Sequence, residues 1–190
     1  TVIPYGYDAD RFKPAGRPAP RSFLTVAQMN ASNFERKGID LLFALADRLP
    51  DCRFTVVGNT PAMRYARVPP NVELVGFVPY EELPAVYARH AFYLQLSIWE
   101  GFPSAPCEAM LCGCVPIVSR VAALPDIAGD AGFYLERRDA DELERTVRAA
   151  LQADGERRSQ AARARIMERY PPAVRQALLR LVEQVAGLAD

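Results

Sequence analysis

The chain is poor in the features that mark several common protein classes. Its 190 residues include one histidine and four cysteines, and the cysteines do not have the spacing of a zinc site. No apolar run reaches the roughly 18–20 residues needed to span a bilayer. We therefore expect Cys52, Cys107, Cys112 and Cys114 to be reduced and packed, which favours a cytoplasmic protein.

An excess of one charge is also missing. The 23 Lys and Arg residues balance the 23 Asp and Glu residues, and they are scattered along the chain. Nucleic acid is not an expected partner, because binding to a phosphate backbone needs a clustered basic face. No linker divides the middle of the chain, so we expect residues 1–190 to form a single domain. The opening "TVIPYGYDADRFKP" lacks an initiator Met and reads like an internal loop, which favours a piece of a longer polypeptide.

Three motifs of nucleotide-dependent enzymes and hydrolases are absent. The segment after the first expected strand, "AQMNASNFERKG", lacks G-x-G-x-x-G, which argues against a dinucleotide-binding dehydrogenase. The chain has no G-x-x-x-x-G-K-[ST] and therefore no P-loop. It also has no G-x-S-x-G nucleophile elbow after a strand, which removes the main signal of one large hydrolase class.

Short β-rich runs alternate with helical segments along the chain. Strands are predicted at 22–26, 53–58, 72–76, 92–97, 115–119 and 132–136, and helices at 37–49, 80–90, 104–112, 140–153, 155–169 and 173–187, with a terminal helix within 170–190. This alternation predicts an α/β fold with a Rossmann-like, doubly wound parallel sheet of about six strands. Ligands of such sheets bind beyond the carboxyl ends of the strands, so we look for chemistry in the loops that follow them.

Two of these loops carry charged residues suited to a ligand. Lys37-Gly38 is predicted to start the helix after the first strand, and "SIWEGFPSAPCEAMLCGCVP" places Glu100 in a Gly-Pro turn and Glu108 in the next helix. A lysine beside a helix N-terminus suits phosphate, and carboxylates accept hydrogen bonds from hydroxyl groups. Phosphate beside several hydroxyls describes a sugar nucleotide. The alternative is that these residues only stabilise helix ends, since a Glu in the first turn stabilises a helix by roughly 0.3–1 kcal/mol through the helix dipole.

Other polar residues have simpler interpretations. Paired aspartates such as Asp8–Asp10 and Asp139–Asp141 can hold a divalent metal, but Asp139–Asp141 opens a helix, where N-cap acids are expected. No metal site is predicted at either. His90, at a predicted helix end, is assigned a capping or packing role. Core packing is the expected role of Trp99, and also of the Phe102 side chain.

The segment "EGFPSAPCEAMLCGCVPIVS" resembles the E-x₇-E signature of the retaining group 1 glycosyltransferases, which have the GT-B fold. "VIPYGYDADRFKP", "RKGIDLL" and "NVELVGFVPYEELPAVYARHAFYLQLS" resemble the neighbouring segments of that family, so the likeness extends to about residue 150. It implies one half of a GT-B enzyme, the C-terminal domain that binds the donor, with the N-terminal acceptor domain absent. It also implies a UDP-, GDP- or ADP-linked sugar donor, a glycan or lipid acceptor and no required cofactor. A role in cell-envelope polysaccharide synthesis follows, in the cytoplasm or at the inner face of the membrane.

The resemblance also implies residue roles. Catalytic roles fall to Glu100, at the donor sugar's hydroxyls, and to Lys37, at the leaving diphosphate. Donor-binding residues are Gly58, Asn59, Phe77, Val78, Gly101, Phe102, Pro103, Ser104 and Glu108, with Glu108 on the ribose and the two loops before it framing the base. Many relatives carry Gly-Arg after the first strand, where this chain has Ala27-Gln28, and Arg36 is the candidate to replace that diphosphate ligand.

Two other functions stay open at this stage. The missing arginine makes a degenerate, non-catalytic sugar-nucleotide-binding module credible, and the isolated domain is expected to be inactive in either case. A phosphorylase or epimerase of the same fold is disfavoured by the glutamate pair. The nucleobase, donor sugar, acceptor and oligomeric state are not determined by the sequence.

Overall fold

Six parallel strands form the centre of the computed structural model, which describes residues 5–187 apart from the side chains of Ala177 and Leu178. The strands are β1 (Ala19–Val26), β2 (Arg53–Val57), β3 (Val72–Val75), β4 (His90–Gln95), β5 (Val115–Ser119) and β6 (Phe133–Leu135). Their order in the sheet is β3-β2-β1-β4-β5-β6. The predicted doubly wound parallel sheet is therefore confirmed, and its order changes direction between β1 and β4, where ligand crevices form in such sheets.

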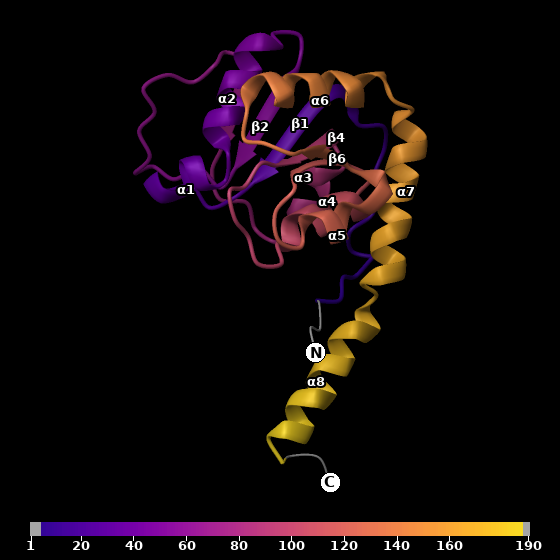
Figure 1. The fold of residues 1–190 in the computed structure, drawn as a ribbon. Helices are drawn as coiled ribbons and strands as arrows, with labels where there is room; N and C mark the ends of the chain where they lie inside the picture. The colour runs from indigo at the N-terminus through magenta and orange to yellow at the C-terminus, as the bar shows by residue number, and fades with distance from the viewer. Residues whose placement is uncertain (1–4, 188–190) are drawn as a thin grey trace.

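Helices cover both faces of the sheet (Figure 1). The elements outside the sheet are α1 (Ala31–Arg36), α2 (Ile39–Arg48), α3 (Leu83–Tyr87), α4 (Ser104–Leu111), α5 (Leu124–Ala128), the 3₁₀ turn η1 (Gly129–Ala131), α6 (Ala140–Gln152), α7 (Gly155–Arg169) and α8 (Pro172–Val185). Apolar side chains of α2 and α6 pack on one face, and those of α3, α4, α5 and α7 pack on the other. Helix α8 extends away from this body (Figure 1).

Strand β4 shows how the strands serve both cores. Phe92, Leu94 and Leu96 point to the face covered by α2 and α6, whereas Tyr93 points to the α4 face. Because side chains alternate along a strand, Gln95 shares the face of Tyr93 and lies beneath α4. This strand therefore carries a polar side chain into the interior immediately before the glutamate-bearing loop.

The predicted helix start at Lys37 is wrong. Lys37 is the C-cap residue of α1, and its N–H donates to the carbonyl of Asn33. Gly38 follows in the left-handed conformation, with φ of 73°, and α2 begins only at Ile39. A Cβ on Gly38 would lie 2.3 Å from the carbonyl oxygen of Leu96, so only glycine fits between α1 and the end of β4. "Lys-Gly" is thus a helix stop followed by a new helix.

Other boundaries differ from the predictions in smaller ways. Helix α3 covers only five of the residues predicted at 80–90, and the short elements α5 and η1 were not predicted. The α8 helix lies within the predicted terminal segment, and residues 1–4 of the expected opening loop lie outside the described residues. No helix between residues 5 and 187 is long and apolar enough to cross a bilayer.

Candidate functional site

The carboxyl ends of β1 and β4 bring Lys37 and Glu100 into contact. The Lys37 ammonium is within ion-pair distance of Glu100 Oε1, although the two residues are 63 positions apart in the sequence. Their side chains are 15% and 8% exposed, so the pair is largely withdrawn from water. The two residues assigned catalytic roles therefore form one charged unit at the switch point of the sheet.

Two further donors fix the same carboxylate oxygen. Gln95 Nε2 donates to Glu100 Oε1 at 2.9 Å, and Ser97 Oγ donates to it at 2.7 Å. Among the described residues, every hydrogen bond to this carboxylate reaches Oε1 and none reaches Oε2. One oxygen of Glu100 is consequently held by the protein, and the other remains available to a ligand.

Glu108 lies deeper than Glu100. It projects from α4, is 6% exposed, and its Oε2 accepts a hydrogen bond from the Tyr87 hydroxyl at 2.9 Å. Burial raises the pKa of the Glu108 carboxyl, and the Tyr87 hydroxyl and the Arg11 charge oppose that rise. The second glutamate of the pair is thus a buried carboxyl with a single protein donor among the described residues.

The N-terminus of α4 separates the two glutamates. Pro103 is its N-cap residue, and no side chain caps its free N–H groups. The side chain of Ser104 accepts a hydrogen bond of 3.1 Å from the Tyr7 hydroxyl. Pro106 lacks an N–H but fits the first helical turn, as expected. The Gly101–Ser104 segment therefore presents backbone donors between the carboxylates, which suits an anionic ligand.

The loops after β2 and β3 form the far side of this edge. Gly58 has φ of 100°, and a Cβ there would lie 2.3 Å from the Ala27 carbonyl oxygen. Asn59 is tied to Tyr65, whose hydroxyl donates to Asn59 Oδ1 at 2.8 Å. Phe77 is 86% exposed, whereas Val78 packs partly into the core. These loops lie where the sequence placed them, with backbone rather than charged side chains at the edge.

Arg36 is restrained by its neighbours. Its Nε and Nη2 donate to Asn33 Oδ1 at 2.9 and 2.8 Å, and its guanidinium lies 4.8 Å from the centroid of the Trp99 ring. The prediction that Trp99 packs in the core is therefore wrong, because Trp99 is 63% exposed and its ring stacks against the Arg36 guanidinium. Phe102 does pack as expected, with its ring edge-to-face against Tyr170.

The remaining candidate residues have structural roles. Asp8 Oδ1 accepts from the N–H groups of Asp10 and Arg11, and Asp139 caps α6 by accepting from Glu142 N–H. Three or more metal-ligating side chains do not gather anywhere in the described part of the chain. His90 is half-buried, and its Nδ1 lies 2.8 Å from the Val86 carbonyl in α3, which agrees with the predicted capping or packing role.

All four cysteines are buried, as predicted. Burial raises the pKa of the Cys107 and Cys112 thiols to about 12. A thiolate nucleophile is therefore not available at either position near neutral pH.

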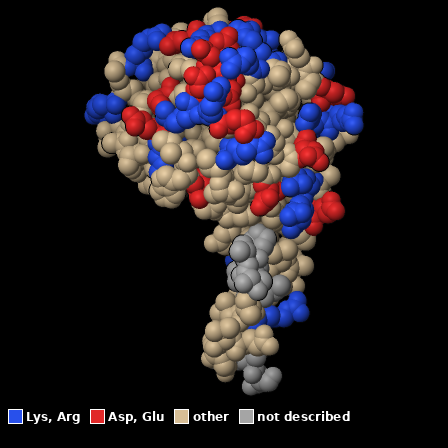
Figure 2. Space-filling model, in the orientation of Figure 1, with Lys and Arg blue, Asp and Glu red and all other residues tan. Residues whose placement is uncertain are grey.

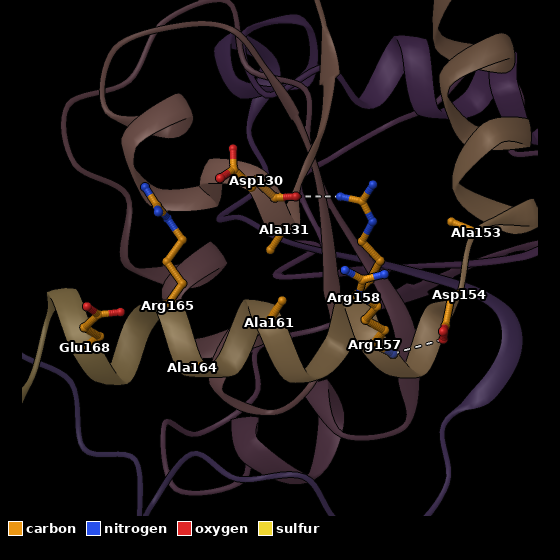
Figure 3. Close-up of a pocket in the computed structure, with 10 residues that line it drawn as sticks. All are labelled: Asp130, Ala131, Ala153, Asp154, Arg157, Arg158, Ala161, Ala164, Arg165 and Glu168. Atoms are coloured by element: carbon orange, nitrogen blue, oxygen red, sulfur yellow. Dashed lines mark hydrogen bonds between the residues drawn. The ribbon is translucent and has the colours of Figure 1, made fainter.

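Of three cavities in the described part of the chain, one of about 600 Å³ lies beside this edge, between α1 and residues 62–67, and includes Tyr65, whereas the other two lie away from it. One of about 600 Å³ lies between η1 and α7 (Figure 3). There Arg158 donates to the Asp130 carbonyl at 2.5 Å, so its guanidinium serves the fold. Another of about 930 Å³ lies near the amino ends of the strands, around Cys52 and His90. Neither glutamate lines any of these cavities, and both are largely buried at the carboxyl edge of the sheet.

Comparison with known proteins identifies the family. The family model for glycosyl transferases group 1 matches residues 8–167, which includes both glutamates, Lys37 and the whole sheet. The chain belongs to the group 1 glycosyltransferases. It is 29% identical over 162 residues to the phosphatidylinositol N-acetylglucosaminyltransferase gpi3 subunit of Schizosaccharomyces pombe, covering 80% of this chain and 35% of that protein. It is 36% identical over 92 residues to the O-antigen chain mannosyltransferase B of Escherichia coli, covering 48% of this chain and 24% of that protein.

Solved glycosyltransferase structures share the fold. The sucrose-phosphate synthase of Thermosynechococcus elongatus superposes with a TM-score of 0.84 at 22% identity, over 100% of this chain and 53% of that one. Anabaena Alr3699/HepE, solved in complex with UDP-glucose, superposes with a TM-score of 0.78 at 16% identity, over 94% of this chain and 56% of that one. This glycosyltransferase domain thus has the architecture of one half of a GT-B enzyme. It spans about a quarter to a third of the length of the two sequence relatives named above.

Sequence reasoning missed the residues that hold the glutamates. Tyr87 binds Glu108, and Gln95 and Ser97 bind Glu100. A signal for the latter two was present, because "LQLS" places polar side chains on alternate positions of an otherwise apolar strand. Such inward-facing polar residues need partners in the interior.

Proposed function

We propose that this glycosyltransferase domain binds a nucleoside-diphosphate sugar and holds it for transfer, with retention at the anomeric carbon, to an acceptor hydroxyl. The observation that carries the proposal is the buried Lys37–Glu100 pair at the carboxyl edge of the sheet, next to the uncapped N-terminus of α4. A diphosphate and a hydroxylated sugar are the ligand groups that match these two features.

Each residue of the edge has a proposed role in this complex. Glu100 Oε2 accepts from hydroxyls of the donor sugar, and Glu108 accepts from the ribose hydroxyls. The backbone of residues 101–104 contacts the sugar and the diphosphate. The loops at Gly58-Asn59 and Phe77-Val78 frame the base.

Charge stabilisation is the proposed source of catalysis. When the bond from the anomeric carbon to the diphosphate oxygen breaks, the leaving diphosphate gains negative charge. Lys37 and the N–H groups of α4 are preplaced to stabilise that charge. We expect Lys37→Ala to reduce turnover of the full-length enzyme by about 10²–10³, by analogy with loss of one oxyanion-site donor. Unchanged turnover would contradict this role of Lys37.

The direct test is a calorimetric titration of the 190-residue chain with UDP, GDP and ADP, repeated on Glu108→Ala. Selective binding of one nucleotide, weakened in the variant, would support the assignment and define the donor class. Equal affinity of the wild type and Glu108→Ala for the bound nucleotide would contradict the ribose role. Glu142→Ala serves as a control, since the carboxylate of this α6 glutamate binds the backbone N–H groups of Glu136 and Arg137 and the Arg137 side chain and makes no contact with this edge.

A non-catalytic sugar-nucleotide-binding module is the second candidate. It is favoured by Arg36, whose guanidinium is engaged by Asn33 and Trp99 in place of a free diphosphate ligand. Turnover of the donor by the full-length protein separates the two functions. Binding with no transfer to any acceptor would favour the module.

The acceptor and location are further proposals. We propose that a glycan or lipid acceptor binds to another domain of the same polypeptide, which forms the opposite wall of the cleft. The named relatives act on phosphatidylinositol and on O-antigen chains, which supports such an acceptor. A cytoplasmic location, at the inner face of a membrane, in cell-envelope polysaccharide synthesis is the setting we propose. Fractionation of cells expressing the full-length protein tests it.

A further inference from the structure

Gln95 is an unusual residue for its position in the fold. It ends β4, a central strand, on the face beneath α4, and it is 2% exposed. Its backbone pairs with Val118 of β5, so the strand ladder does not need its side chain. Packing alone would favour an apolar residue here, because a buried amide must find partners for its polar atoms.

The polar atoms of the Gln95 amide are all hydrogen-bonded, in a network that ends at Glu100. The Tyr93 hydroxyl, fully buried, donates to Gln95 Oε1 at 3.0 Å. Gln95 Nε2 then donates to Ser97 Oγ and to Glu100 Oε1, both at 2.9 Å. The orientation of the amide is chemically determined, because the flipped amide would place its oxygen against the carboxylate.

We propose that Gln95 is a positioning residue that fixes the rotamer of Glu100 and so presents Oε2 to the donor sugar. The inference rests on the proposed function, and it assigns Gln95 no contact with the ligand. Three donors converge on Oε1, from Lys37, Gln95 and Ser97. Lys37 is the C-cap residue of α1 and Ser97 follows the end of β4, whereas Gln95 belongs to the strand itself. Its amide is therefore the donor that holds the Glu100 carboxylate in a fixed position relative to the sheet.

The geometry predicts a selective effect on the sugar. Without Gln95, Glu100 keeps its charge and its contact with Lys37 but loses its fixed direction. Binding of the free nucleoside diphosphate, which does not use Glu100, should change little. Binding of the sugar nucleotide should weaken, because its hydroxyls meet a carboxylate that only Lys37 and Ser97 still hold.

The test replaces Gln95 with methionine, which keeps the length and volume of the side chain and removes its donors. Dissociation constants are measured by calorimetry for UDP against UDP-N-acetylglucosamine and for GDP against GDP-mannose. We expect Gln95→Met to weaken the sugar nucleotide about tenfold, the equivalent of one hydrogen bond to a charged group, and to leave the free nucleotide unchanged.

A matched control removes a buried hydrogen bond elsewhere in the sheet. Thr25 is 3% exposed, and its Oγ1 donates to the Leu94 carbonyl at 2.9 Å. Thr25→Val should lower stability to a similar extent and leave the affinity ratio of sugar nucleotide to nucleotide unchanged. If Gln95→Met alters that ratio no more than Thr25→Val does, Gln95 is merely structural and the proposal is overturned. The proposal is also overturned if the wild type binds the sugar nucleotide no more tightly than the free nucleotide.

Amide exchange separates failure of this proposal from failure of the proposed function. If the wild type binds no nucleotide, the proposed function fails. The hydrogen bond from Gln95 to Glu100 is then tested separately, by NMR measurement of amide proton exchange. The Gln95 side-chain amide protons should exchange slowly in the wild type and faster in Glu100→Gln. Exchange as fast as that of a solvated glutamine in the wild type would refute the positioning role by itself.

Discussion

Replacing Lys37 with methionine tests whether Lys37 and Glu100 behave as a buried ion pair. The change keeps most of the apolar stem and removes the ammonium that contacts Glu100 Oε1. The glutamate side chain is 8% exposed, so little water can replace the lost cation. Removing one partner of a buried pair costs about 3–5 kcal/mol, because the other charge remains uncompensated.

The surviving contacts reduce that cost. Gln95 and Ser97 still donate to Glu100 at 2.9 and 2.7 Å. Since the pair is also not fully enclosed, we expect Lys37→Met to lower the free energy of unfolding by about 2–4 kcal/mol, somewhat less than the range for fully buried pairs. For a chain of this size, each kcal/mol shifts the melting temperature by about 2–4 °C.

The assay is urea unfolding followed by circular dichroism, in a double-mutant cycle with Glu100→Gln. The double variant, which buries no uncompensated charge, should recover at least part of the loss, with a coupling energy of about 1–3 kcal/mol. A loss below about 0.5 kcal/mol in Lys37→Met would refute the reasoning, because it is the behaviour of an exposed pair. Arg67→Met is a control, since Arg67 pairs with Asp47 on the surface, with side chains 66% and 39% exposed.

Three further predictions concern the backbone and two titratable groups, the half-buried His90 and the buried Glu108. Gly58→Ala should destabilise the chain by more than about 1–2 kcal/mol in the same unfolding assay, because Gly58 has φ of 100° and the Ala27 carbonyl leaves no room for a Cβ. Gly101→Ala is the control and should be nearly neutral, since no atom lies within 4 Å of the position of its Cβ. Burial lowers the pKa of His90 from 6.5, so the unfolded chain binds a proton first and stability should fall as pH drops below 6.5. His90→Asn should flatten that part of the stability–pH profile. An unchanged slope in the variant would contradict this prediction. Burial raises the pKa of Glu108 from 4.5, so the folded chain holds its proton longer and the Glu108 contribution to stability should fall as pH rises above 4.5. Glu108→Gln should therefore stabilise the ligand-free chain at neutral pH while weakening nucleotide binding, and a variant no more stable than the wild type at pH 7 would contradict this.

On the face shown in Figure 2, the charged side chains do not gather into a patch of one sign. Basic and acidic side chains are interspersed over the body on the face shown in Figure 2, in agreement with their scatter along the sequence. Much of α8 in that view is neither basic nor acidic, and its Leu179, Val182 and Val185 are exposed.

Much of the fold and the location of the site could be predicted from sequence because both depend on local patterns. Alternation of β-rich and helical runs predicted the parallel sheet, and parallel strands place their following loops on one edge. The glutamates of "EGFPSAPCE" were therefore expected on that edge, and they lie there. The stop of α1 at Lys37-Gly38 is also encoded locally, by a glycine in the left-handed conformation, but the sequence pattern alone predicts a helix start there.

Contacts between distant segments were decided by the tertiary structure. Lys37 meets Glu100 because β1 and β4 are neighbours in the sheet, and strand order does not follow from the alternation of elements. The same adjacency places Arg36 over Trp99, whose ring would otherwise be expected in the core. Which oxygen of each glutamate is held, and by which buried side chain, depends on how α3, α4 and β4 pack. The sequence by itself determined the chemistry available at the edge, and only the packed fold decided how that chemistry is oriented.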